Sequence, residues 1–349
     1  MNKRWKKRPK GSNWGDFGEN DQVGRLNLLT PEKVKQAIRE VREGKTFCLS
    51  LPLDYPGGNT MNENRYPPIL RPTLRHGGVN MNYVFRSQNP DSLDVLSDDL
   101  AIIHLQYSTQ WDALSHVGAL FDVNDDGRSL PVYYNGYRAS QDILAPDSVE
   151  GCGLSSEMAR ESTSNAKALG IENMAKTGVQ GRAVMIDLHK YYGDERVVVG
   201  YATLIKIMAD EGIVVEEGDM LCLHTGLADL ILRMRKNPDK DVIMNSCAVL
   251  DGGDEALQEW ITRSGIAVIA TDNYAVEDFP VQLPNKSCSI LPLHNLCLFK
   301  LGIHLGELWH LTPLAHWLKE NNRHRFLLTA PPLRLPGAVG SPVTPVATV

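Results

Sequence analysis

The second half of the chain alternates apolar strand patterns with helix patterns, and this alternation narrows the folds open to it. Strands are expected at 183–186, 220–224, 266–270 and 325–329, and helices at 201–210, 254–263 and from Thr312 onward. The first two helices are closed by Gly212 and Gly265. Such alternation is typical of α/β proteins, in which helices cover a sheet. With no internal repeat in the chain, the pattern predicts one mixed α/β domain.

The remaining elements are less regular. Thr30 and Pro31 suit the N-cap and first position of a helix, which Gly44 is placed to end. Extended segments are expected at 46–53, at 98–107, where the strand is buried, and at 295–301. The segment 55–78 is rich in Pro, Gly, Asn and Arg and is long for a loop of a compact domain. It is expected to form a pocket wall or an oligomer contact.

Charge and cysteine usage limit the partners and the compartment. A net charge of −6 argues against nucleic acid as the main partner, because binding it requires a basic surface. Residues 1–13 hold the basic cluster and are expected to form a solvated tail before a domain spanning 14–349. No apolar run approaches the length of about 20 residues that a membrane span needs, and no secretory signal is evident. The six cysteines are scattered without a C-x-x-C pair, which predicts free thiols and a cytoplasmic protein.

The segment 106–116 concentrates side chains that bind metal ions or transfer protons. Gln106, Gln110, Asp112 and His116 lie within eleven residues. A helix around Asp112 would place Asp112 and His116 on one face. A strand would turn the two glutamines and Asp112 to one side, although about 13 Å would separate Gln106 from Gln110. The alternative is an amphipathic element with a capping aspartate and a surface histidine.

A second polar group lies between His294 and His310. Its spacing is not H-E-x-x-H, so the zinc-protease motif is excluded. If 301–309 is extended, Glu307 lies on an apolar face, whereas His304 and His310 lie on the other. A buried carboxylate requires a cation, a metal or a shared proton. The alternative is a surface carboxylate at the start of a helix.

Other polar residues and motifs carry less information. Asp187, His224 and Asp272 each follow an expected strand, where roles in turns or helix caps are expected. The chain has no P-loop, no G-x-G-x-x-G after a strand and no G-x-S-x-G elbow.

Several motifs together resemble one family. The segment 109–116, Thr-Gln-Trp-Asp-Ala-Leu-Ser-His, is similar to the signature H-x-G-T-H-x-D-x-P-x-H of the cyclase family of metal-dependent hydrolases. That family includes bacterial kynurenine formamidase, isatin hydrolase and lactone-ring hydrolases. Further segments resemble its longer members: 13–18, 24–32, 134–137, 272–277, 302–307 and 330–343. The resemblance covers nearly the whole chain. It implies a single α/β domain with a mixed, curved, barrel-like β-sheet flanked by helices, of the swivelling β/β/α type, and a homo-oligomer (dimer or tetramer).

The resemblance also implies a set of site residues. The two histidines and the aspartate that bind the family's divalent ion correspond to Gln106, Gln110 and Asp112, so only the aspartate is retained. The last histidine of the signature corresponds to His116, placed for acid/base work. The histidine and glutamate that complete two-ion sites correspond to His294 and Glu307.

Replacing imidazole by carboxamide changes the ligand chemistry. A Gln oxygen is a harder and weaker ligand for Zn²⁺ than imidazole and suits Mn²⁺ better. Three arrangements stay open at this point: an ion bound by Gln106, Gln110 and Asp112; an ion shifted toward Asp112, His116, His294 and Glu307; or loss of metal binding.

The implied activity is that of a divalent-metal-dependent hydrolase, with Zn²⁺ or Mn²⁺, that opens a small cyclic amide or lactone or cleaves a small amide. The expected catalytic residues are His116, Glu307 and His294, with Trp111 and the segment 55–78 as candidates for the pocket wall. The alternatives are a metal-free acid/base lyase or isomerase and a catalytically silent binder of small ligands.

Overall fold

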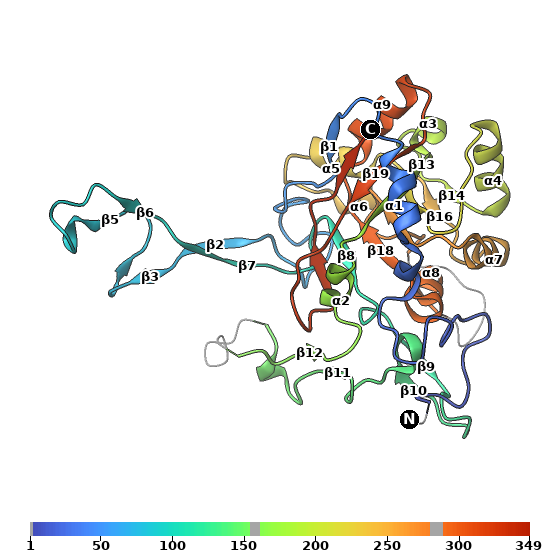
Figure 1. The fold of residues 1–349 in the computed structure, drawn as a ribbon, viewed down its shortest axis with the longest axis horizontal. Coiled ribbons are helices and arrows are strands. Elements are labelled where there is room, and N and C mark those ends of the chain that lie inside the picture. Colours follow the sequence, from blue (N-terminus) through green and yellow to red (C-terminus); the bar gives the residue numbers. More distant parts are fainter. Residues whose placement is uncertain (1–2, 154–160, 280–288) are drawn as a thin grey trace.

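A nine-stranded mixed sheet forms the centre of the computed structural model, which describes residues 3–153, 161–279 and 289–349. The strands, in spatial order, are β1 (Thr46–Cys48), β21 (Val346–Thr348), β19 (Arg325–Thr329), β13 (Gln180–Asp187), β15 (Met220–His224), β17 (Val268–Thr271), β18 (His304–Glu307), β8 (Gln110–Asp112) and β20 (Gly340–Pro342). The four strands from β13 to β18 are mutually parallel, and the remaining pairings are antiparallel. The sheet curls into a half-barrel flanked by helices (Figure 1), which confirms the mixed α/β single domain expected from the sequence.

The central parallel strands are buried on both faces, as parallel strands generally are. Val184 and Ile186 of β13 belong to a core with α4 (Tyr201–Asp210) and α7 (Glu255–Ser264). Ala183 and Met185 of the same strand belong to a second core with α9 (Thr312–Glu320). Alternate residues of one strand therefore anchor helices on opposite sides of the sheet.

The expected helices form where their caps and periodicity indicate. α1 (Pro31–Ile38) starts after Thr30, whose side chain accepts a hydrogen bond from Lys33 N, but it ends six residues before Gly44. The other short helices are α2 (Ile171–Lys176), α3 (His189–Tyr192), α5 (Leu227–Arg233), α6 (Lys240–Met244) and α8 (Pro292–His294). 3₁₀ turns occur at Gly24–Leu28, Phe85–Ser87, Tyr134–Gly136 and Val149–Gly151. No helix in the described residues is long and apolar enough to span a bilayer.

Three expected extended segments differ in the structure. Asn295–Leu301 is a π-helix, because its apolar side chains pack into the core as a helix and the chain leaves it at Gly302 with a φ of 62°. A short apolar run does not by itself distinguish a buried helix from a strand. The strand expected at 98–107 is shorter and exposed, as β7 (Asp99–Ile102), and the one at 46–53 is limited to β1.

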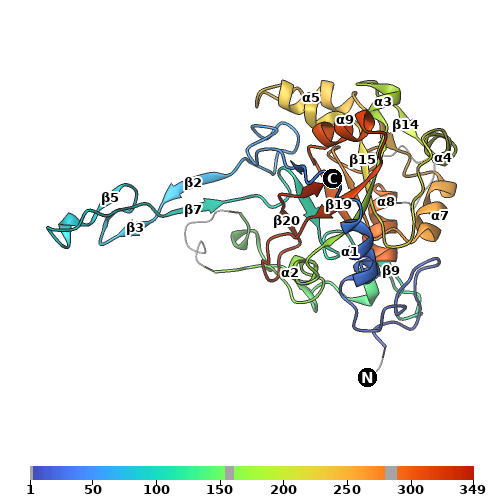
Figure 2. The same cartoon turned by 45° about the horizontal axis from the view of Figure 1, so that its top comes forward.

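A long ribbon projects from the body, and both views show it extending well beyond the sheet (Figures 1 and 2). It begins inside the segment that was expected to be a loop. β2 (Ile69–Pro72) pairs with β7, and the outer part contains β3 (Leu74–Arg75), β4 (Gly78–Val79), β5 (Tyr83–Val84) and β6 (Val95–Leu96). Residues 69–102 are called the arm below.

Three smaller strand pairs complete the fold. They are β9 (Ala119–Phe121) with β10 (Leu130–Val132), β11 (Ile143–Leu144) with β12 (Asn165–Ala166), and β14 (Val198–Val199) with β16 (Val249–Leu250). Near the N-terminus, Trp5 is buried and packs edge to face against Trp14.

Candidate metal centre

Two neighbouring strands bring the first polar side chains together. β8 and β18 pair antiparallel, with Gln110 opposite Glu307 and Asp112 opposite Leu305. Residues that lie opposite each other in such a pair, and residues two apart along a strand, point to the same face. Gln110, Asp112 and Glu307 therefore share one face of the sheet. Trp111 points to the other face, where it packs edge to face on Trp309 in the core rather than in a pocket wall.

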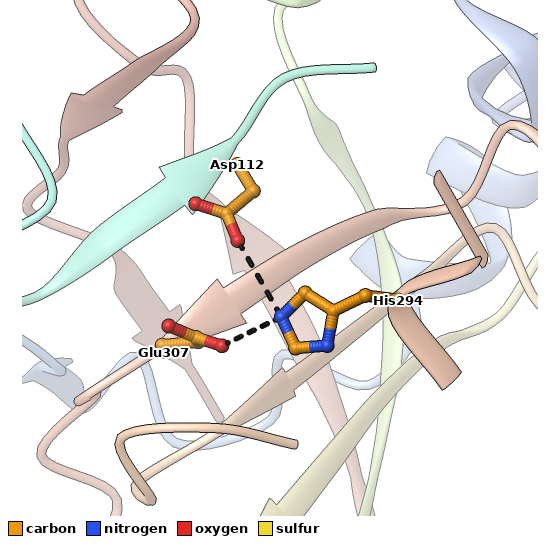
Figure 3. A group of neighbouring side chains, drawn as sticks. All are labelled: Asp112, His294 and Glu307. Carbon is orange, nitrogen blue, oxygen red and sulfur yellow. Dashed lines mark ion pairs between the residues drawn. The ribbon is translucent and has the colours of Figure 1, made fainter. Parts of the chain in front are cut away.

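His294, at the end of α8, completes a compact cluster with the two acids. Its Nε2 lies 3.3 Å from Oε1 of Glu307 and 3.9 Å from Oδ2 of Asp112 (Figure 3). One ligand atom from each of the three residues lies within 4.8 Å of the others. All three side chains are buried, with Glu307 only 5% exposed. Carboxylate oxygen and imidazole nitrogen are suitable ligands for Zn²⁺ and other divalent transition metals.

Gln110 connects the two carboxylates through one amide nitrogen. Its Nε2 donates to Oδ1 of Asp112 at 3.2 Å and to Oε2 of Glu307 at 3.1 Å. Two buried oxygens are left over, Oε1 of Gln110 and Oδ2 of Asp112, which have no hydrogen-bond partner among the described residues. Buried polar atoms are nearly always paired. The leftover oxygens and the donor set therefore fit a bound divalent cation.

A fourth buried residue, Glu277, orients His294. Its Oε1 lies 2.8 Å from Nδ1 of His294, and its carboxylate also accepts from the backbone N–H groups of Leu293 and His294. A carboxylate only accepts hydrogen bonds, so Nδ1 carries the proton and Nε2 points toward the two acids. Metal-binding histidines are commonly held in this way by a carboxylate on the other ring nitrogen.

The charges in the cluster influence one another. Burial, together with the nearby charge of Asp112, raises the pKa of Glu307. Burial by itself would lower the pKa of His294, but hydrogen bonds to Glu277 and Glu307 outweigh that effect and raise it. A protonated His294 thus balances negative charge at the point where the ligand atoms converge.

His116 lies at the edge of the cluster and, unlike His294, is neutral. Its Nε2 is 3.9 Å from Oδ1 of Asp112, which is too long for a direct hydrogen bond. Burial lowers the pKa of His116 despite the neighbouring Asp112. A neutral imidazole at neutral pH is able to accept a proton.

The cluster lines a cavity of about 220 Å³. Gln106 and His116 line the same cavity, and its apolar lining includes Met61, Tyr274, Phe279, Leu291 and Leu308. Arg65 also lines it, and its guanidinium donates to the carbonyl of Gln106 at 2.6 Å. Part of the segment 55–78 therefore does form a pocket wall, as expected.

The residues expected from the sequence are only partly brought together. Asp112, His294 and Glu307 form the cluster, with Gln110 bridging and His116 at its edge. Gln106 lines the same cavity, and its amide lies against Gly340, the residue opposite Asp112 in the sheet. The orienting Glu277 and the cation Arg65 were not among the expected site residues. Glu277 lies close behind the expected strand 266–270, a position that could have indicated it.

The residues that were expected to serve turns and caps do so. Asp272 accepts hydrogen bonds from the backbone N–H groups of Thr225 and Gly226 at the start of α5. Asp187 accepts from the N–H of Lys190 and also contacts Nδ1 of His224 at 2.8 Å. Asp187 and Asp272 therefore fix the starts of α3 and α5 at the carboxyl ends of β13 and β17.

The fold and the cluster define an α/β protein with a candidate metal centre at the antiparallel edge of its sheet. The chain belongs to the putative cyclase family, whose model matches residues 49–278. A crystal structure described as a novel cyclase is 30% identical, with a TM-score of 0.72 over 97% of both chains.

More distant structures share the fold. Isatin hydrolase A from Labrenzia aggregata, bound to benzyl benzoate, is 13% identical with a TM-score of 0.55, over 90% of this chain and 98% of that one. Isatin hydrolase A from Ralstonia solanacearum is 12% identical with a TM-score of 0.53, over 87% and 91%. Comparison with curated protein sequences gives no significant match.

Proposed function

We propose that this chain is a divalent-metal-dependent hydrolase that opens a small cyclic amide or lactone, or cleaves a small amide. The observation that carries the proposal is the convergence of Asp112, His294 and Glu307, which line a cavity with ligand atoms within 4.8 Å of one another. Glu277 aims the His294 nitrogen into that space. Two isatin hydrolases of the same fold are described as bound to benzyl benzoate and to a product analogue, thioisatinate, which supports a small ring-bearing substrate.

Of the arrangements open from the sequence, we propose the second in a narrower form, in which His116 is not a ligand. Asp112, His294 and Glu307 would hold the ion. The carboxamide oxygen of Gln110, which has no hydrogen-bond partner among the described residues, is a further candidate ligand atom. Two carboxylates with one imidazole suit Zn²⁺ or Mn²⁺. When bound, such an ion lowers the pKa of a coordinated water and polarises a carbonyl oxygen.

The chain's own groups handle protons and orientation. His116, neutral because burial lowers its pKa, is placed to take a proton from water and to return it to the leaving nitrogen or oxygen. Burial and Asp112 raise the pKa of Glu307 in the absence of an ion, so Glu307 would have to lose any proton it holds in order to serve as a ligand. The apolar wall would pack on the body of the substrate and keep bulk water away.

The test is metal content together with turnover. Protein purified without chelator is expected to hold about one equivalent of metal per chain by elemental analysis and to hydrolyse members of a panel of cyclic imides, lactones and aryl formamides. Asp112→Asn should lose both properties, whereas Glu259→Gln, on the exposed surface of α7, should keep both.

Other outcomes of that test contradict the proposal. Turnover that survives EDTA in metal-free protein would favour the metal-free lyase or isomerase. Ligand-induced stabilisation without turnover of any panel compound would favour the silent binder.

We further propose a cellular location and an oligomeric state for the enzyme. Cys48, Cys152, Cys222, Cys247 and Cys297 are free thiols, which supports a cytoplasmic location. We also propose that the working form is a homo-oligomer.

A further inference from the structure

The base of the arm is apolar on both of its faces. β2 and β7 pair in a register that places Leu70 opposite Ala101 on one face and Ile69 opposite Ile102 on the other. Of the eight residues in the two strands, only Arg71 and Asp99 are charged, and the other six are apolar. A two-stranded ribbon in water normally turns polar side chains outward on at least one face. This ribbon does not.

The apolar side chains of the arm are exposed and concentrated. Nine of the twenty exposed large hydrophobic residues in the described chain lie within its 34 residues. They include Leu70 at 67%, Leu74 at 81% and Leu93 at 82% exposure. Such a concentration of exposed apolar side chains marks an interaction site rather than ordinary scatter of surface residues.

Side-chain contacts within the arm nevertheless stabilise its conformation. The side chain of Asn80, 4% exposed, donates to Oγ1 of Thr73 and to Oδ2 of Asp98, both at 2.9 Å. Further out, the guanidinium of Arg75 stacks over the rings of Tyr83 and Phe85, at 5.3 and 4.8 Å from their centroids. An isolated ribbon is marginal in water, so these contacts shape a surface that still lacks a covering layer.

We infer that the arm is a dimerisation arm whose apolar faces pack against a second copy of this chain. Charge supports this occupant. The outgoing part, 69–86, carries Arg71, Arg75 and Arg86 and no acid, whereas the returning part carries Asp91, Asp94, Asp98 and Asp99 and no base. A twofold, face-to-face packing that lays the outgoing strand of one arm over the returning strand of the other matches basic with acidic strands in both halves. Such self-complementarity is what an isologous interface requires.

The same charges argue against other occupants. Three arginines and four aspartates give the arm a net charge of −1, which provides no attraction to nucleic acid or to an anionic membrane. Pro72 lies within β2 and lacks the backbone N–H that strand addition at that edge would use. Contact through the apolar faces, rather than extension of the ribbon by a foreign strand, is therefore favoured. The inference does not depend on the proposed chemistry.

The arm also leaves the body at the pocket. Arg65 lies four residues before β2 and Gln106 four residues after β7, and both line the cavity that the acid cluster also lines. A partner that holds the arm would consequently fix the backbone on both sides of this part of the pocket wall.

The experiment is the oligomeric state of the full chain, measured by sedimentation at micromolar concentration. The wild-type protein is expected to be a dimer or a multiple of one. Leu70→Asp and Leu100→Asp alter opposite faces of the ribbon, and each should raise the dissociation constant at least about tenfold. Arg71→Glu should weaken the dimer as well, because an acidic strand would then meet an acid. Leu120→Asp, on β9 at 73% exposure, is the matched control and should leave the constant unchanged.

Far-UV circular dichroism verifies that each variant is folded, which is expected because the altered side chains are exposed. A wild-type chain that sediments as a monomer would overturn the inference. So would a dimer whose dissociation constant is unchanged in both leucine variants, since its interface would then lie elsewhere.

Discussion

Nδ1 of His294 lies 2.8 Å from a carboxylate oxygen of Glu277, and this contact decides which nitrogen of the ring faces Asp112 and Glu307. The same carboxylate accepts two backbone N–H groups at the start of α8, so it anchors the helix as well as the ring. Glu277 lies at the end of the segment after β17, and His294 lies seventeen residues further along. A buried acid thus links the parallel part of the sheet to the cluster at its antiparallel edge.

Glu277→Gln should weaken metal binding while leaving the fold intact. The amide keeps the shape of the side chain but presents a weaker acceptor to Nδ1, so the ring is less firmly oriented and Nε2 is less basic. Loss of such a partner typically costs about 10–100-fold in metal affinity. Competition with a fluorescent chelator would measure the change for Zn²⁺ and Mn²⁺. Affinity equal to that of a Glu259→Gln control would show that Glu277 serves only to anchor α8.

Metal binding should release a proton, and its apparent affinity should rise with pH. The hydrogen bonds to Glu277 and Glu307 raise the pKa of His294, so the ring is protonated at neutral pH without an ion. The proton must leave Nε2 before that atom can act as a ligand. Below the raised pKa, affinity is therefore expected to increase by up to about tenfold per pH unit. Calorimetry in buffers of different ionisation enthalpy would count the released protons, and a count of zero would contradict the charge state assigned to His294.

Local signals in the sequence predicted much of the sheet. The strands at 220–224 and 325–329 were predicted with the bounds that the structure has, because each is a short apolar run between clear turns. Tyr201–Asp210 was predicted equally well, from its periodicity and the glycine that follows it. In these segments the local preference and the tertiary environment agree.

The failures share a different cause. Leu100 and Ile102 look like residues of a buried strand, but the structure exposes Leu100 on a ribbon that leaves the body. The apolar run from Asn295 to Leu301 is compatible with strand and helix alike, and only its packing selects the π-helix. Hydrophobicity indicates that a surface will be covered, and it does not indicate by which element or by which chain.

The cluster could be anticipated only through the family resemblance. Asp112 and Glu307 are nearly two hundred residues apart in the sequence, and only the register of β8 and β18 brings them together. No local sequence pattern indicates the register in which β8 and β18 pair. The amide of Gln110, as placed, bridges the two acids through its nitrogen, an arrangement that spacing alone did not suggest.

A buried charge network far from the cluster is expected to govern stability. Asp219 is fully buried and accepts hydrogen bonds from Lys33 Nζ at 2.9 Å and from Arg182 Nε at 2.8 Å, which ties α1 to β13. Asp219→Ala would leave two buried cations without this partner and should cost about 3–5 kcal/mol of unfolding free energy. Denaturant titration would measure it. The exposed pair Lys206–Asp210 is the control, and Asp210→Ala should change stability by less than about 0.5 kcal/mol.

The Asp219→Ala molecules that remain folded should bind metal normally, because the network does not touch the pocket. An Asp219→Ala protein with wild-type stability would mean that Glu216, which also pairs with Arg182 at 2.8 Å, is sufficient to compensate both cations.

His304 is expected to make the fold less stable in mild acid. Its ring is buried in β18, and burial lowers its pKa from 6.5 to about 3. Between these values the unfolded chain takes up a proton that the native chain does not. The contribution of His304 to stability is therefore complete above pH 6.5 and is lost as the pH falls toward 3, by up to about 1.4 kcal/mol per pH unit. Unfolding free energies of the wild type and of His304→Gln, measured by urea titration from pH 8 to pH 4, should run parallel above pH 7. Below pH 6 the wild-type curve should fall more steeply, because only the wild type has this proton to gain on unfolding. Curves that stay parallel over the whole range would mean that His304 titrates alike in the folded and unfolded chains.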